Sequence, residues 1–157
     1  MCLINRQRTI HRRIALSSNN TLTGTSEDHA RASIANKFWD PQRGLVSHLD
    51  PGTPVPADNT QLQDAANKAI DQRIRGAGYC AGGRQYSDGE ITYGGSNSGA
   101  TRRAAVTWWM SDTDHRIALL KPSWREFGVH AQRGSAFPGG NDAASATFVV
   151  DFGSCTK

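Results

Sequence analysis

The sequence lacks several patterns that would assign a function at once. No apolar run approaches the ~20 residues that a membrane-spanning helix needs, and no secretory h-region stands at the N-terminus. None of the three cysteines forms a C-x-x-C pair, which argues against a zinc ribbon. The glycine-rich stretch 81–83 has no Gly-Lys-Ser/Thr ending and therefore does not indicate a phosphate-binding loop.

What is present suits one domain over 1–157, because 157 residues can bury a substantial core. The net charge of +4 favours anionic partners such as cell-wall polymers, phospholipid or nucleic acid, without choosing among them. Residues 40–63 contain four prolines and form a long irregular connection. Loops of this length inside a compact domain are often functional.

Hydrophobic periodicity predicts helices at 2–15, from Thr25 or Ser26 to 39, at 63–76 and at 99–112. Alternation predicts strands at 126–132 and 146–152, which a turn at 135–144 joins into an antiparallel pair. His29 lies beside the apolar stripe of the second helix, and we expect it to be structural.

The stretch 108–116 is the first candidate for chemistry. Two tryptophans and Asp112 lie on one side of the fourth helix, and His115 follows three residues later. If the helix continues, Asp112 and His115 face the same way and present a carboxylate and an imidazole together. The alternative is that Asp112 lies in a turn and that His115 is an ordinary surface residue.

A set of short motifs covers nearly the whole chain in a consistent order. They are Asn5 with Arg8; Ser47-His48; Arg73-Ile74-Arg75-Gly76-Ala77-Gly78-Tyr79; Gly89-Glu90-Ile91; Trp109 with Asp112, His115 and Arg116; Phe127-Gly128-Val129; and Asp151-Phe152-Gly153. In this order they resemble the bacterial branch of the CAP superfamily, also called SCP. One departure is Ile91, which stands where that family usually has asparagine.

The resemblance implies an α+β fold, a three-layer α-β-α sandwich with a small and mainly antiparallel sheet. It also implies a cleft in which His48, Glu90, Asp112 and His115 converge. His48 and His115 would hold a divalent metal, zinc being the first choice, while Glu90 and Asp112 would act as catalytic acids or bases. Asp112 is preferred to Ser111 because the family spacing fits when it is counted from Trp109.

The resemblance further implies secretion, with the signal peptide missing from this sequence. In an oxidising compartment two of the three cysteines can pair. Of the three pairings we expect Cys2–Cys80, with Cys155 free or bonded between chains. The alternative is a cytosolic protein with three reduced thiols.

Three functional hypotheses follow. The first is a secreted CAP domain that hydrolyses an envelope component or a peptide with the help of a metal ion. The second is a non-catalytic module that binds lipid, wall polymer or a protein partner. The third is a basic nucleic-acid-binding protein or nuclease, although nucleic acid is not the expected partner because the basic first helix has no interleaved aromatic residues.

Overall fold

A computed structural model describes residues 2–156 and shows an α+β architecture built on a four-stranded sheet of order β1-β3-β4-β2. The strands are β1 (Ser17–Ser18), β2 (Gln85–Ser96), β3 (Glu126–Arg133) and β4 (Ser145–Thr156). The helices are α1 (Leu3–Ile10), α2 (Asn20–Asn36), α3 (Asn59–Gly76), α4 (Arg102–Ser111) and α5 (Thr113–Leu119), with short 3-10 turns η1 (Gly44–His48), η2 (Asn97–Gly99) and η3 (Asp142–Ala144).

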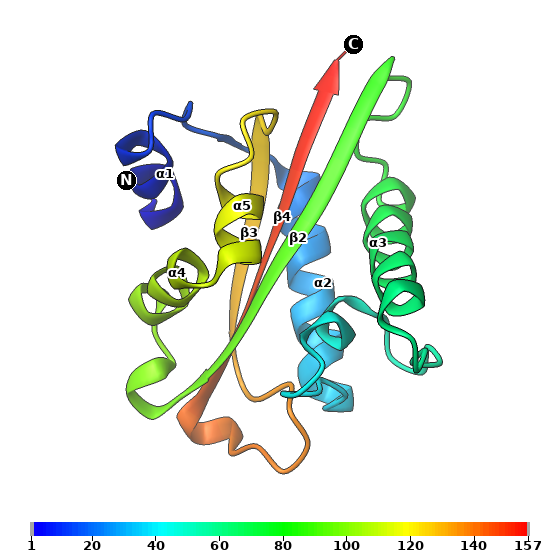
Figure 1. Ribbon diagram of the computed structural model, residues 1–157, viewed down its shortest axis with the longest axis vertical. Helices are drawn as coiled ribbons and strands as arrows, with labels where there is room; N and C mark the ends of the chain where they lie inside the picture. Colours follow the sequence, from blue (N-terminus) through cyan, green and yellow to red (C-terminus); the bar gives the residue numbers. More distant parts are fainter. Residues whose placement is uncertain (1, 157) are drawn as a thin grey trace.

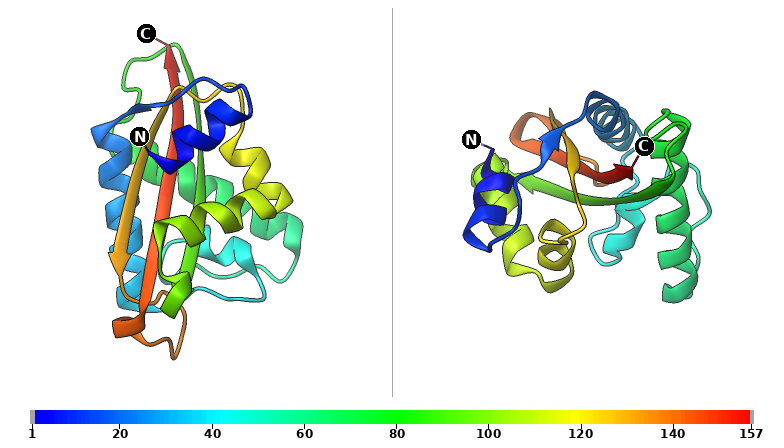
Figure 2. Two further views of the ribbon diagram at one scale, coloured as in Figure 1. Left: turned by 90° about the vertical axis from the view of Figure 1, so that its left-hand side faces the viewer. Right: turned by 90° about the horizontal axis from the view of Figure 1, so that it is seen from above.

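The elements form three layers (Figure 1). Helix α2 covers one face of the sheet, while α1, α4 and α5 cover the other (Figure 2). Helix α3 and the turn η1 stand beside the free edge of β2. This arrangement confirms the expected three-layer α-β-α fold.

The long strand β4 holds the sheet together because it pairs with a neighbour on each side. It runs antiparallel to β2 over twelve residue pairs, from Gln85↔Thr156 to Ser96↔Ser145. It is also antiparallel to β3, as expected. The sequence did not predict β2 as a strand, nor the two-residue β1, which runs parallel to β3.

Two helices begin earlier than the apolar periodicity suggested. Helix α2 begins at Asn20, where the Asn19 side chain accepts hydrogen bonds from the backbone N–H groups of Thr21 and Leu22. Helix α3 begins at Asn59, with Asp58 as its cap. In both, the first turn has only one apolar residue, Leu22 or Leu62, so a capping side chain rather than an apolar face marks the start.

The two faces of the sheet differ in chemistry. The face under α1, α4 and α5 is a continuous apolar core that contains Trp109, Phe148 and Phe152. On the α2 face, the buried side chains of β4 include Asp151 as well as Val149. A Cβ atom at Gly128 would lie 2.0 Å from the backbone of Leu22, so glycine is what allows α2 to approach the sheet this closely.

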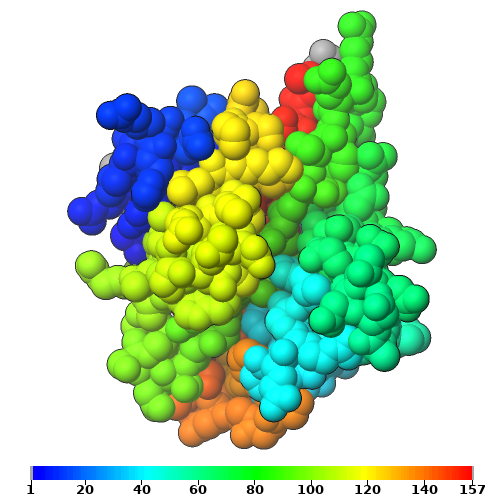
Figure 3. Space-filling model, in the orientation of Figure 1, coloured from blue at the N-terminus to red at the C-terminus, as the bar shows by residue number. Residues whose placement is uncertain are grey.

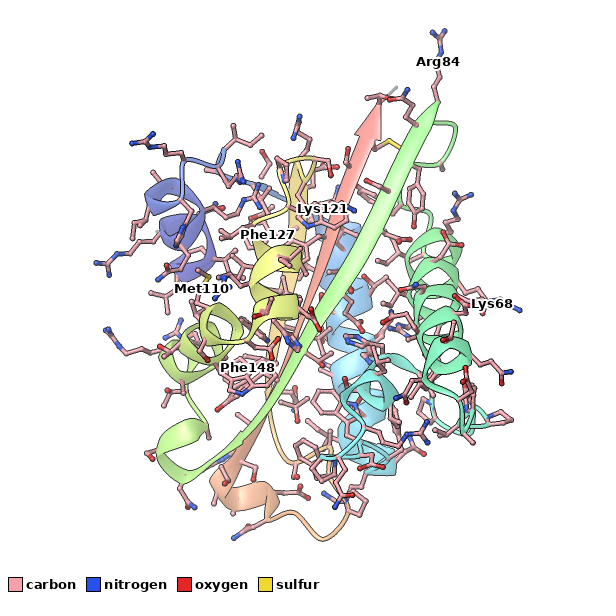
Figure 4. All side chains as sticks on the ribbon, in the orientation of Figure 1. Lys68, Arg84, Met110, Lys121, Phe127 and Phe148 are labelled. Atoms are coloured by element: carbon pink, nitrogen blue, oxygen red, sulfur yellow. A yellow bond between two sulfur atoms is a disulfide. The ribbon has the colours of Figure 1, made fainter. Side chains whose placement is uncertain are left out.

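The disulfide prediction was wrong. The bond joins Cys80 to Cys155, with 5.5 Å between their Cα atoms, and Cys2 is free and exposed. Pairing of β2 with β4 places Cys155 opposite Tyr86, next to the loop that carries Cys80. The bond is visible near the labelled Arg84 (Figure 4). Because this pairing joins segments 75 residues apart, it follows from strand register and not from local spacing.

Candidate functional site

The first carboxylate–imidazole pair is Glu90 on β2 with His48 at the end of η1. The Nδ1–H of His48 donates to Glu90 Oε1 at 2.8 Å. The guanidinium of Arg73, on α3, donates to Glu90 Oε2 at 2.9 Å and to the His48 carbonyl at 3.0 Å. Both oxygens of Glu90 are therefore engaged, and its side chain is 0% exposed.

The charge on Glu90 survives burial because cations and donors surround it. Burial alone would raise the pKa of Glu90, but the Arg73 guanidinium, with His29 and His48, holds that pKa well below its usual range. Arg73 is held in turn by Asp50, at 2.8 Å. Glu90 is thus a fixed carboxylate that orients His48.

His29, which we expected to be structural, belongs to the same buried cluster. Its Nε2–H donates to the Ser47 carbonyl at 2.8 Å, and Nε2 lies 3.8 Å from Glu90 Oε1. Burial lowers the pKa of His29, which keeps its ring neutral near pH 7. Within residues 2–156, its Nδ1 has no hydrogen-bond partner.

Asp151 is a second buried acid behind the first pair. It is the direct cross-strand partner of Glu90, and its Oδ2 accepts from Thr25 Oγ1 at 2.6 Å and from Ser26 Oγ at 3.0 Å. Within residues 2–156, Oδ1 has no hydrogen-bond partner. Burial and the neighbouring Glu90 carboxylate raise the pKa of Asp151 well above its usual range. The raised pKa favours the neutral, protonated form of Asp151 beside the Glu90 carboxylate.

The second carboxylate–imidazole pair is Asp112 with His115. The fourth helix does not continue through Asp112; it ends at Ser111, and Asp112 is the N-cap of α5. Asp112 Oδ1 accepts from the His115 backbone N–H at 3.0 Å and from its Nδ1–H at 2.7 Å. These hydrogen bonds lower the pKa of Asp112, whose side chain remains 43% exposed.

The two tryptophans, which we expected to lie together on one side of the helix, differ in burial. The Trp109 side chain is buried and its indole N–H donates to the Thr92 carbonyl at 2.8 Å. Trp108 is 42% exposed, and its ring lies edge-on to His115 with 4.5 Å between centroids. Trp108 is therefore a wall of the site and not a core residue.

Both pairs line one cleft of about 560 Å³. In the space-filling view it is the groove between α5 and the segment that carries η1 (Figure 3). Aromatic side chains from Tyr93, Trp108 and Phe137 form part of its wall, and its acids are Asp40, Glu90, Asp112 and Asp114. No Lys or Arg is among the described residues that line it.

The two imidazoles of the cleft are each held by a carboxylate at one ring nitrogen. Each ring uses Nδ1 on a carboxylate, which leaves the Nε2 lone pair of the neutral ring for a ligand. Within residues 2–156, no group of three or more His, Cys, Asp or Glu residues is arranged to hold a metal ion. The same residues contain no helix long and apolar enough to cross a membrane.

Three members of the site, Asp151, Arg73 and His29, were not predicted as such from the sequence. In the sequence, Arg73 and Asp151 stood out only as members of the motifs that resemble the CAP superfamily. A signal was present, since Asp151 interrupts the apolar run Val149-Val150-Asp151-Phe152, and an acid at a buried strand position needs a partner.

Similarity to known proteins is found in structure alone. No family model matches the sequence, and no curated protein matches it. An outer surface protein of Borrelia burgdorferi is similar with a TM-score of 0.64 and 18% identity, over 98% of this chain and 88% of that one.

Two further solved structures are similar. One is an extracellular protein containing an SCP domain from Bacillus anthracis, with a TM-score of 0.56 and 16% identity over 99% of this chain and 38% of that one. The other is a cysteine-rich secretory protein from Staphylococcus aureus, with a TM-score of 0.53 and 14% identity over 99% and 36%. The chain thus spans little more than a third of these two proteins. These similarities show the CAP/SCP fold.

Proposed function

We propose that this protein works outside the cytoplasm and that its cleft binds a divalent metal ion between the Nε2 atoms of His48 and His115. Zinc is the best match, because neutral imidazole is one of its usual ligands. The location is supported by the Cys80–Cys155 disulfide and by the structural similarity to an outer surface protein and an extracellular protein.

The observation that carries the proposal is the pairing of each imidazole with a carboxylate at the same ring atom. Metal-binding histidines commonly donate their second N–H to a carboxylate, which fixes the tautomer and raises the basicity of the ligand nitrogen. Here Glu90 does this for His48 and Asp112 does it for His115, in one cleft. With only two protein ligands, we expect an exchangeable site completed by water.

The two acids have different roles in this proposal. Glu90 is fully buried with both oxygens engaged, so it is a positioning carboxylate. Asp112 is partly exposed at the cleft and is the group placed to take a proton from a bound water or substrate. Any hydrolysis of an envelope component or peptide would therefore depend on Asp112 for proton transfer.

The lining of the cleft favours a neutral or cationic ligand. Among the described residues, four acids line it and no Lys or Arg does, although the whole chain carries a net charge of +4. Phosphate-rich polymers are held by basic side chains, so this lining does not suit the nuclease alternative. A binding module for a neutral ligand remains the second candidate, favoured by the exposed Trp108 ring.

Calorimetric titration of the purified protein with zinc tests the proposal. We expect one weak site, which His48→Ala or His115→Ala removes. Asp112→Asn should weaken zinc binding by about 10–100-fold, the usual loss when a carboxylate partner of a ligand histidine is removed. Asp114→Asn is the matched control, because Asp114 also lines the cleft but has no side-chain hydrogen bond to His115. Zinc binding that is unchanged in both histidine variants would refute the proposed site.

A further inference from the structure

The excess positive charge of the chain is confined to its first segment. Residues 1–26 contain four arginines and neither Asp nor Glu; the first acid is Glu27. Of the 18 Lys and Arg residues, the other 14 balance the 14 Asp and Glu residues. The net charge of +4 is therefore a local property and not a general one.

The fold extends this segment into a continuous surface. Helix α1 ends at Ile10, and a turn through Arg12, with φ of 55°, lets the Arg13 N–H donate to the Arg8 carbonyl at 2.8 Å. The Arg13 side chain donates to the Leu120 carbonyl at 3.0 Å, next to Lys121. Arg13 and Arg125 are both close enough to lower the pKa of Arg8, after burial as the main cause.

We call this surface the N-terminal patch, and define it by its exposed residues Arg6, Ile10, Arg12, Arg13, Ile14, Lys121 and Arg125. The carboxylate of the neighbouring acid, Glu126, accepts hydrogen bonds from Asn19 and Tyr79 and not from a cation of the patch. None of the patch residues lines the cleft. Helix α1 lies on the side of the molecule away from α3 (Figures 1 and 2).

Two large apolar side chains stand among these cations. Ile10 is 62% exposed and Ile14 is 53% exposed. A soluble polyanion offers such side chains nothing to bury against. A bilayer offers negative headgroups and an apolar layer within a few ångströms of each other, and basic surfaces with protruding aliphatic residues bind there.

We propose that the N-terminal patch docks the protein onto a membrane surface that contains anionic phospholipid. The arginines and Lys121 contact the headgroups, and Ile10 and Ile14 enter the boundary between the headgroups and the acyl chains. The cleft stays free for its own ligand, since the two surfaces share no residue.

Co-sedimentation with vesicles of phosphatidylcholine, with and without phosphatidylglycerol, tests the proposal. We expect binding only to the anionic vesicles, and weaker binding as salt is raised. The double variant Arg12→Glu/Arg13→Glu should bind at least about 25-fold more weakly, because each basic side chain near an anionic bilayer contributes about fivefold.

The chain supplies a matched control in a second exposed arginine pair, Arg102-Arg103, at the start of α4. Arg102 lines the same surface hollow as Arg133. Arg133 is the last residue of β3, whereas Arg125 of the patch precedes the first residue of that strand. Arg102→Glu/Arg103→Glu changes the net charge by the same amount. If both double variants lose binding equally, net charge alone explains it and the patch is refuted.

The isoleucines separate a bilayer from a soluble polyanion. Ile10→Ser/Ile14→Ser should weaken vesicle binding roughly tenfold or more, because the apolar contribution is lost. The same variant should bind long-chain polyphosphate as the parent does. Vesicle binding that is unaffected by this change would overturn the membrane proposal and leave an anionic polymer as the partner of the patch.

Discussion

The two carboxylate–imidazole pairs of the cleft have the same hydrogen bond, from a ring Nδ1–H to a carboxylate oxygen. They differ in which elements of the fold carry the two partners. Glu90 and His48 are 42 residues apart and come from a strand and a 3-10 turn, with Arg73 of α3 as a third member. Asp112 and His115 are three residues apart at one helix start. The Glu90 side chain is 0% exposed and that of Asp112 is 43% exposed.

The Glu90 carboxylate depends on residues from several elements of the fold for its stability. The Asp112 carboxylate is positioned by its own helix start. Glu90 is charged in a buried place only because Arg73 and the histidines surround it. Asp112 is charged at the surface, where water also solvates it. The pairs can orient their imidazoles equally well while contributing very differently to stability.

The largest expected effect on stability is that of a substitution in the buried pair of Glu90 and His48. Glu90→Gln should lower the free energy of unfolding by about 3–5 kcal/mol, because removing one partner of a buried ion pair leaves the other uncompensated. Here the uncompensated group is Arg73, which would keep Asp50 as its ion-pair partner and its hydrogen bond to the His48 carbonyl. Urea denaturation at pH 7 measures it. A loss no greater than that of Asp112→Asn would show that the two pairs do not differ as described.

A pH titration of stability should distinguish the two acids of the buried cluster. Asp151 has a raised pKa when folded. Its contribution is complete below its unfolded pKa of about 3.9 and is lost as pH rises through the folded pKa. Glu90 has a lowered pKa, so its contribution is present above about 4.3 and is lost as pH falls.

Asp151→Asn should therefore remove a negative slope in the unfolding free energy above about pH 4. At most the slope changes by about 1.4 kcal/mol per pH unit, the value for one proton. Asparagine has nearly the shape of aspartate, and its side-chain oxygen can still accept from Thr25 and Ser26, so the variant should fold. An unchanged slope in urea denaturation between about pH 4 and 7 would mean that Asp151 is ionised in the folded protein.

Much of the fold was predictable, because it follows from patterns within single segments. The strand pair β3–β4 and the cores of α1, α2, α3 and α4 came from periodicity, and the layer arrangement came from the order of the motifs. Helix α5 was not predicted as a separate helix. Strand β2 was missed because glycines such as Gly89 and Gly94, together with polar residues, interrupt its apolar alternation. The strand is defined by its pairing with β4. The starts of α2, capped by Asn19, and of α3, capped by Asp58, were missed because each first turn has only one apolar residue.

In the candidate site, too, the residues that one segment brings together were predictable from the local sequence, and those that tertiary pairing brings together were not. The structure brings His48 and Glu90 into one pair, Asp112 and His115 into another, and both pairs into one cleft. The Asp112 pair was visible in the local sequence, although the expected reason, a continuous helix, was wrong. The roles of Arg73 and Asp151 could not be predicted, because β2–β4 register and the packing of α3 and α2 bring them to Glu90. The same tertiary pairing decides Cys80–Cys155 over Cys2–Cys80.

The smallest expected effect on stability is at the exposed pair, where capping and imidazole orientation can be separated. Asp112→Asn should change the free energy of unfolding by only a few tenths of a kcal/mol, because asparagine caps helices about as well as aspartate. Asp112→Ala should cost about 1 kcal/mol, because the α5 cap is lost. Urea denaturation of both variants beside the parent measures the difference.

The ring of His115 gives a second readout of the same two variants. Its Nδ1–H is held by the Asp112 carboxylate at 2.7 Å. Nitrogen NMR of the imidazole at a pH where the ring is neutral should show this tautomer in the parent, weakened in Asp112→Asn and lost in Asp112→Ala. His48 should keep its Nδ1–H tautomer in both variants, because Glu90 reaches it from β2, independently of α5. If the His48 ring changes tautomer together with His115, the two pairs are coupled through the cleft. They are then not independent of each other, although their separate hydrogen bonds indicate that they are.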